Sequence, residues 1–446
     1  MKKLLLALPL IAGTSWAGTS YYVGSSTQDA YTELLTQLNE FKPFTLVNEE
    51  YSAGLAKSTA ITKVMASAAP DAEVLFRLQH DIDHSPVGLD GAGVRFGAAA
   101  IKTTLVLPND ASHSMLQGFS SEESVVINTD VKFDGSATHQ LLVSSFETMK
   151  DGDSIKFDGL DYSAVVNGDA IKGSGSIGEF TFDSPMASIK LAPGTIDVDL
   201  EKFADGVFSG SYGILFDELS IESVAMPFGV TAQEIGFSSN SKINGTTFDT
   251  DGKISVGNIE SPLPVNNFSI AVGTHDLSVE GTSNYFKTMS QFSALSADNA
   301  SNPEFLNQWF SAMIGVFIPR AGITYDIDVN NDGGNAYVKI SMSVIDDSSP
   351  NYPTTGLTSL TTVRDFLNVT QAEFSLQADA AALDQTPLAA FLVSPQVEQF
   401  VLADGVSYQS KINVKDLIVD INGNPLSLEL IMGDTLDMPL PAIAGI

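Results

Sequence analysis

The sequence predicts an α+β protein that is predominantly β: a long, curved antiparallel sheet with covering helices and one N-terminal hydrophobic helix. Apolar and polar residues alternate with a period of two through most of residues 46–281, the pattern of strands with one buried face. Asp-Gly and Asn-Gly pairs separate these runs, as they do in tight hairpins. Later segments, at residues 284–295 and 303–317, have helical spacing instead.

The composition is that of a folded chain without cysteine chemistry. Of 446 residues, 43% are apolar and 17% are charged, which is enough for a substantial core in one to three domains. The absence of cysteine excludes disulfides, thiolate catalysis, Fe–S clusters and Cys-ligated zinc. Stability must therefore come from burial and strand pairing.

The net charge restricts the partners. The formal charge of −32, from 54 acidic and 22 basic residues, repels the phosphates of nucleic acids, so we expect no nucleic-acid partner. It also disfavours docking on anionic lipid head groups. Any membrane attachment must come from a hydrophobic segment.

Such a segment lies at the N-terminus, in residues 1–25. Lys2 and Lys3 precede an apolar run that ends in Ser15–Ala17, a small-x-small pattern typical of signal-peptidase sites. No charge occurs before Asp29, so Leu4–Val23 offers about 20 uncharged residues, the length of a bilayer-spanning helix. Cleavage near Ala17 and retention as an anchor are both open, and both predict export.

A second helix is predicted in residues 26–45. Ser26 and Asp29 fit an N-terminal cap, and Pro43 ends the segment. Its apolar stripe consists of Tyr31, Leu34, Leu35, Leu38 and Phe41.

Residues 46–281 form the predicted sheet. Ile196, Val198 and Leu200 alternate with acidic residues, and many other runs repeat this pattern. The predicted tight turns include Asp134-Gly135, Asn167-Gly168, Asn244-Gly245 and Asp251-Gly252. Composition changes little along this region, so it indicates no internal boundary.

The remaining elements alternate helix and strand. Residues 282–320 read as a helical segment in which Pro303 begins a broad apolar stripe that ends before Pro319. Residues 321–446 read as a hairpin, helical turns and C-terminal strands around Asn422-Gly423, continuous with the main sheet. The apolar strand face needs cover, and these helices are the candidates.

A glycine-rich motif has the residue pattern of a dinucleotide-binding loop but not its structural context. Gly173–Gly178 fits G-x-G-x-x-G, but that motif binds pyrophosphate where a strand leads into a helix. Here Glu179–Asp183 alternates with period two, so we interpret the motif as a turn or strand bend.

Two residue groups are candidate metal ligands. Asp328, Asn330 and Asp332 match the first half of a calcium loop, but Lys339 stands where the bidentate glutamate belongs, which favours a hairpin loop. His80 and His84 share a strand face, yet no third ligand is identifiable, which favours core histidines. We expect no metal and no cofactor, and no catalytic motif is present.

Several short motifs occur in order along almost the whole chain. They are Tyr22-Val23-Gly24, Tyr51-Ser52-Ala53-Gly54, Ile82-Asp83-His84-Ser85-Pro86, Ile101-Lys102-Thr103-Thr104-Leu105-Val106, Asn422-Gly423-Asn424-Pro425-Leu426 and Met438-Pro439-Leu440-Pro441-Ala442. Together they resemble the YdgA family of Gram-negative inner-membrane and periplasmic proteins, which has no established biochemical role. Asp83, His84, Pro86, Asn422 and Gly423 are motif residues of this resemblance, and Ser85 replaces the usual glycine. The resemblance implies a retained membrane anchor with the rest of the chain in the periplasm.

These observations favour a non-enzymatic cell-envelope protein on the periplasmic side of the inner membrane. Part of the apolar sheet face is expected to remain open as a groove for acyl chains. The alternative is an interaction scaffold with a closed core, whose acidic exterior binds a protein or divalent cations, and an enzyme is the third reading. A lipid ligand and a homo-oligomer both remain open.

Overall fold

The computed structural model describes Leu35 and residues 45–52, 57–65, 74–83, 87–90, 93–106, 124–150, 152–225, 228–261, 265–293, 303–383, 392, 394 and 397–440. The chain forms two compact units. Unit 1 comprises residues 1–201 with the short stretches 223–225 and 290–294, and unit 2 comprises the rest. The predicted fold class is confirmed, because both units consist mainly of antiparallel strands.

Unit 1 contains a meandering antiparallel sheet. Across this sheet, each strand pairs with the next one in the order given in the following sentence. The order is β1 (Thr45–Ser52), β2 (Lys57–Met65), β3 (Val74–Asp83), β6 (Ala99–Val106), β7 (Val125–Val131), β8 (Ala137–Val143), β11 (Leu160–Asn167), β12 (Ala170–Ile177) and β15 (Gly194–Ala204). A separate hairpin joins β4 (Val87–Asp90) to β5 (Gly93–Phe96).

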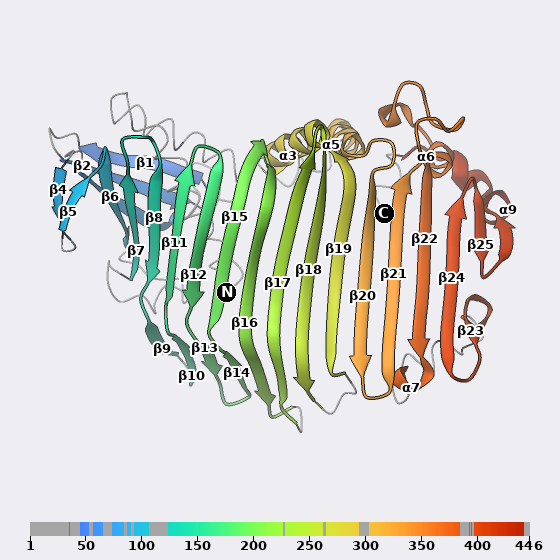
Figure 1. Ribbon diagram of the computed structural model, residues 1–446, viewed down its shortest axis with the longest axis horizontal. Coiled ribbons are helices and arrows are strands. Elements are labelled where there is room, and N and C mark those ends of the chain that lie inside the picture. The colour runs from blue at the N-terminus through green and yellow to red at the C-terminus, as the bar shows by residue number, and fades with distance from the viewer. Residues whose placement is uncertain are drawn as a thin grey trace. The chain divides into compact units, whose positions relative to one another are not determined.

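A second tier of unit 1 continues four of these strands across aligned breaks (Figure 1). Its strands pair in the order β9 (Phe146–Lys150), β10 (Asp153–Phe157), β13 (Phe180–Asp183) and β14 (Ala187–Leu191). The breaks fall at residues 144–145, 158–159, 178–179 and 192–193, which we call the crease. Backbone pairing persists there, since Gly178 N donates to Gly159 O at 2.7 Å and Asp158 N donates to Glu179 O at 2.9 Å.

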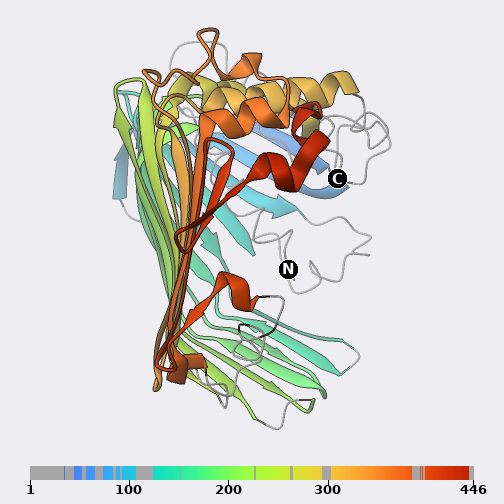
Figure 2. The same cartoon turned by 90° about the vertical axis from the view of Figure 1, so that its right-hand side faces the viewer.

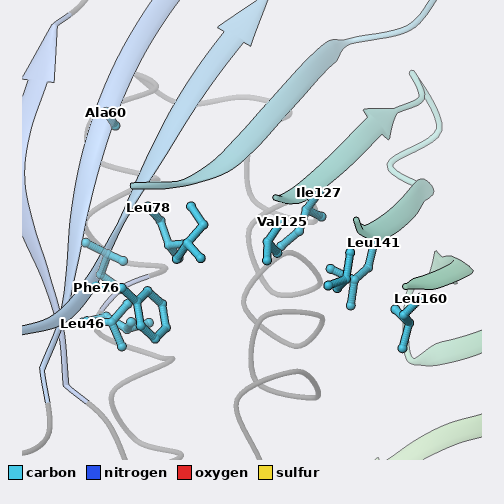
Figure 3. Packing of buried hydrophobic residues seen from close by; sticks show 12 residues of the cluster. Leu46, Ala60, Phe76, Leu78, Val125, Ile127, Leu141 and Leu160 are labelled. Carbon is cyan, nitrogen blue, oxygen red and sulfur yellow. The ribbon is translucent and has the colours of Figure 1, made fainter. Parts of the chain in front are cut away.

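The core of unit 1 lies on one face of its larger sheet. Buried side chains from several strands converge there (Figure 3). Leu35, which is helical, is 7% exposed and belongs to this cluster. The remaining residues of the predicted helix at 26–45, and the predicted N-terminal hydrophobic helix, lie outside the described residues.

The glycine-rich motif is part of strand β12, as its interpretation as a strand bend required. The ring of Tyr162 on β11 lies over Gly173, where a Cβ would come within 2.8 Å of Tyr162 Cζ. At Gly175 the backbone of β11 is too close for a side chain, since a Cβ would lie 2.7 Å from Tyr162 Cα. Gly178 follows at the crease. The motif leads directly into strand β13 and not into a helix whose N-terminus could bind a phosphate.

Unit 2 is a second antiparallel meander with helices. Across its sheet, each strand pairs with the next one in the order given in the following sentence. The order is β16 (Val207–Ser223), β17 (Val230–Asn244), β18 (Thr247–Glu260), β19 (Asn267–Ser278), β20 (Gly322–Asn331), β21 (Gly334–Val344), β22 (Thr370–Asp379), β24 (Ser407–Lys415), β25 (Ile418–Ile421) and β26 (Asn424–Ser427). The two-residue strand β23 (Leu402–Ala403) also pairs with β24.

The longer helices of unit 2 lie at one end of its strands (Figures 1 and 2). Helix α3 directly continues β19, α5 precedes β20, and α6 precedes β22, so all three meet the sheet at the same end. The helices are α3 (Val279–Ser293), α5 (Pro303–Val316), α6 (Val363–Val369), α7 (Ala380–Leu383) and α9 (Leu428–Met432). None of these described helices has the length and apolar content that crossing a bilayer requires.

Most predicted elements of unit 2 are present. Helix α5 begins at Pro303 as expected, and the hairpin of β20 and β21 turns at Asp332 and Gly333. Helix α3 begins five residues before the predicted Asn284, because Ser278 Oγ accepts a hydrogen bond from Gly281 N at 3.0 Å and caps the helix directly after β19.

The turn predicted at Asp251-Gly252 is wrong. Both residues lie inside β18, where Gly252 is paired with Ser239 on one side and with Val272 on the other. Pairing on both edges of a central strand outweighs the local turn preference of an Asp-Gly pair. The turns predicted at Asp134-Gly135 and Asn244-Gly245 are confirmed, since each separates two paired strands.

The crease gives a testable prediction at Gly159. Its φ is +102°, and a Cβ there would lie 2.7 Å from the carbonyl oxygen of Val143. We expect Gly159→Ala to lower the free energy of unfolding by about 1–3 kcal/mol, from left-handed strain plus this overlap. Urea denaturation measures the change.

Gly135→Ala is the matched control, because Gly135 also has a positive φ, +84°, but a Cβ there meets nothing within 4 Å. It should cost less than Gly159→Ala. Equal losses for the two variants would show that the crease places no steric demand on Gly159.

Candidate functional site

The sheet of unit 2 carries continuous rows of apolar side chains on one face. Because the strands pair in register, a residue on one strand lies beside its partner on the next, and alternate residues share a face. Row one consists of Val272, Tyr325, Ile340, Phe374 and Ile412. Row two consists of Ile214, Phe237, Ile254, Ile270, Ile327, Val338 and Leu376. No member of either row is charged.

The middle of these rows is exposed. Phe237 is 39% exposed, Ile254 44%, Tyr325 39% and Ile340 42%, although all four point away from the polar face. Fully covering a large apolar side chain is worth about 1.5–3 kcal/mol, so each of these residues retains roughly 1 kcal/mol that a covering molecule would gain. We call the parts of rows one and two that carry these four residues the open face.

Compact clusters bound the open face at both ends of the strands. At the helix end, Val207, Phe248 and Leu277 pack with Val279 and Val316 of α3 and α5. At the other end, Leu376 and Ala378 pack with Leu383, Leu392 and Val401 from the segment that follows β22. The described helices therefore cover the ends of the strands and leave the middle uncovered.

The opposite face of the same strands is polar. Tyr337 Oη donates a hydrogen bond to Asp326 Oδ1 across β20 and β21, and this bond raises the pKa of Tyr337 to about 12. Lys411 Nζ lies 3.3 Å from Glu373 Oε1 on β24 and β22. These interactions keep the acidic, solvated surface on one side and the apolar rows on the other.

Of the two histidine candidates, the structure describes His80. His80 lies 2.9 Å through Nε2 from Thr62 Oγ1 and 2.9 Å through Nδ1 from Thr103 Oγ1. Burial lowers its pKa to about 4, which keeps the ring neutral. His84 lies outside the described residues. Within the described part of the chain, no cluster of three or more His, Asp or Glu side chains could hold a metal ion.

The calcium-loop candidates are spread over a hairpin. Asp328 and Asn330 lie on β20, and Asp332 lies in the turn, where its Oδ1 accepts a hydrogen bond from Asn266 Nδ2 at 2.7 Å. The turn is also held by Asn331, which is buried and donates from Nδ2 to Ala382 O at 2.6 Å. Hydrogen bonds within the protein account for this loop geometry.

The described residues of the family motifs lie in a turn and at the end of a strand. Asn422 and Gly423 form the turn between β25 and β26 with φ of +52° and +86°. Asn422 also accepts from Lys411 N at 2.7 Å through Oδ1 and donates to Phe400 O at 3.0 Å through Nδ2. Asp83 is the last residue of β3, and Pro86 lies outside the described residues.

Sequence alternation signals that a strand has an apolar face but not whether that face is covered. Ile323–Val329 shows the same period as the fully packed strands of unit 1. The exposure of Tyr325 and Ile340 depends on where the helices pack, which the period does not encode.

Comparison with known proteins identifies one family. The model of a family described as bacterial protein of unknown function, DUF945, matches residues 1–429. No curated protein and no solved structure matches the chain.

A buried histidine of unit 1, His139, predicts a pH dependence of stability. His139 is 5% exposed, its Nδ1 lies 2.9 Å from Thr129 Oγ1, and burial lowers its pKa from 6.5 to about 4. Between pH 6.5 and pH 4, His139 is protonated in the unfolded chain but stays neutral in the folded chain. We therefore expect stability to fall as the pH drops from 6.5 to 4, by roughly 3 kcal/mol for this residue.

His139→Gln should flatten this dependence while keeping a polar partner for Thr129. Urea denaturation at several pH values measures it, and only the difference between wild type and variant is compared, because carboxylates titrate in both. Parallel curves for the two proteins would mean that His139 is protonated as readily folded as unfolded.

Proposed function

The chain belongs to the bacterial DUF945 family, whose function is unknown, and we propose that it is a non-enzymatic cell-envelope protein that binds acyl chains on the open face. The observation that carries the proposal is the uninterrupted apolar character of row two across seven strands, with Phe237 and Ile254 left exposed in it.

A hydrocarbon chain fits the chemistry of this face. The backbone groups of the sheet are paired within the sheet, and the rows contribute aliphatic and aromatic side chains. An acyl chain has no hydrogen-bonding groups, so covering these rows leaves none of its atoms unsatisfied. A folded protein partner would instead bring a polar rim and would need matching polar groups.

The N-terminal sequence supports a place in the envelope. Lys2 and Lys3 followed by the uncharged Leu4–Val23 are typical of an export signal or anchor, and the resemblance to the YdgA family favours an anchor in the inner membrane. An anchored chain would have its binding face beside a source of acyl chains. A soluble periplasmic form, cleaved near Ala17, is the alternative.

The scaffold alternative has less support from the described residues. That reading requires an apolar face closed by helices. Four large side chains in the middle of the face are instead at least 39% exposed. A face left in this state favours a ligand over a sealed structural core.

Ile340 tests acyl-chain binding. A carboxylate placed in row one would have to be desolvated under the ligand, so Ile340→Asp should weaken binding of a fluorescent acyl probe at least tenfold. Ser341→Asp is the matched control, because Ser341 is the next residue of β21 and lies on the polar face. It should bind like the wild type.

The full-length chain is used for both titrations, and thermal melts confirm that the variants are folded. Mass spectrometry of an organic extract should identify acyl lipids that co-purify with the wild-type protein. A wild-type protein with no extracted lipid and no probe binding would refute the proposed function, as would equal loss in Ile340→Asp and Ser341→Asp.

Fusion of alkaline phosphatase to the C-terminus tests the location. The enzyme is active only where its disulfides form, so the fusion should be active in cells if the chain is exported. The mass of the purified chain distinguishes a retained segment from cleavage near Ala17. An inactive fusion of full length would contradict the envelope assignment.

A further inference from the structure

The four exposed members of the open face form an oblique strip across the strands. On β17 and β18 they are Phe237 and Ile254 of row two, and on β20 and β21 they are Tyr325 and Ile340 of row one. From β17 to β21 the strip crosses four strand spacings, or about 19 Å. Its width is the distance between two rows, about 7 Å, so the strip is long and narrow.

The strip is oblique because the cluster that follows β22 covers row two on that side. Val338 of row two and Phe374 of row one both pack against this cluster, which includes Leu376 and Leu383. Row one therefore stays exposed as far as Ile340 on β21, while row two is exposed on the strands that lie farther from the cluster. One end of the strip is thus closed at β22.

At the other end of the strip, row one has a gap. Its positions on β17 and β18 are held by Ser239 and Gly252, which pair with each other, and Gly252 also pairs with Val272 on β19. A Cβ at Gly252 would lie 3.8 Å from Val272 O and 4.0 Å from Ser238 O. Apart from its chain neighbours, no described side chain comes within 4 Å of that position. The space above Gly252 is therefore open, and we call it the notch.

The surroundings of the notch suit a hydrocarbon. Tyr212 on β16 pairs with Ser239 and is 39% exposed, and the centroid of its ring lies 5.6 Å from that of Phe237. On the side of the helices, Ser241 Oγ and Thr250 Oγ1 are 2.9 Å apart, so these two hydroxyls satisfy each other. The notch thus offers apolar contacts and does not require a polar group of the ligand.

We propose that the open face binds one long acyl chain, which lies across the strands from the notch to Ile340, and that the notch sets the longest chain that is fully covered. This rests on the proposed function and adds its chain-length specificity. An extended hydrocarbon advances about 1.3 Å per carbon, so a strip of about 19 Å covers roughly fifteen carbons. Gly252 is then the residue that determines the length limit.

The area of the strip favours this occupant over a second copy or another protein. About 19 Å by 7 Å amounts to roughly 130 Å². A stable protein interface buries about 800 Å² on each partner. The chain's own clusters already occupy both ends of the strands, so the strip does not widen there. Its dimensions match a single hydrocarbon chain.

A series of saturated fatty acids of eight to twenty carbons tests the proposal on the full-length chain, by displacement of the fluorescent acyl probe. The carboxylate is common to the series, so differences in affinity report on the hydrocarbon. Each added CH₂ that the strip covers should tighten binding about threefold to fourfold. The gain should stop at about sixteen carbons, the carboxyl carbon included.

Gly252→Leu fills the notch and shortens the strip by about one strand spacing, or roughly four carbons. The gain should then stop at about twelve carbons, while shorter acids bind as they do to the wild type. Gly213→Leu on β16 is the matched control, because Gly213 pairs with Ser238 on the polar face. A Cβ there meets Phe237 O at 3.5 Å and Ser238 Cβ at 3.9 Å, so it is also tolerated. This control should keep the wild-type limit.

Thermal melts verify that both variants are folded, and the outcomes separate the two proposals. Affinity that rises through twenty carbons, or one limit shared by the wild type and both variants, overturns the chain-length assignment. Acyl-chain binding then still stands on the loss seen in Ile340→Asp. If Gly252→Leu does not fold, the position of the limit in the wild type decides alone. If the wild type binds no acid of any length, both proposals are overturned.

Discussion

Strand register is the constraint on which the rest of the molecule depends. In unit 2 each strand pairs with the next without a shift through the middle of the sheet, so that Ile270, Ile327 and Val338 stand side by side although they come from three different strands. A slip of one residue would move every apolar side chain to the acidic face. Regular pairing thus produces both the polar surface and the apolar rows.

The same alternation of apolar and polar residues produces a covered face in unit 1 and a partly exposed face in unit 2. In unit 1, the residues of the apolar face such as Ile127 and Leu141 are 2% and 4% exposed. Burial lowers the pKa of His80 and of His139 on this face, and each ring lies within hydrogen-bond distance of a threonine hydroxyl. In unit 2, helices and the segment after β22 pack against the ends of the strands, and the middle remains accessible. The difference lies in what packs on each sheet and not in the strands themselves.

The sequence was sufficient to predict which segments are strands and which are helices, but not which segments pack on each sheet. Period-two runs around Ile196 and Ile323 and the helix beginning at Pro303 are local signals, and all three are confirmed. The turn predicted at Asp251-Gly252 is wrong because strand pairing on both edges of β18 outweighs the local turn preference of this pair. The boundary between the units near residue 201 leaves no mark in composition, since β15 alternates in the same way on both sides of it. The hydrogen bond between the hydroxyls of Ser241 and Thr250 could not be predicted either, because these residues become neighbours only through the hairpin.

The meander also governs how the chain can fold. Apart from the step from β19 to β20, across which α3 and α5 intervene, the strands from β16 to β21 pair with their immediate predecessor in sequence. Each pairing closes only a short loop and so loses little chain entropy. A chain synthesised from its N-terminus onward can build such a sheet one hairpin at a time. The closure over α3 and α5 would then be the slow step of assembly.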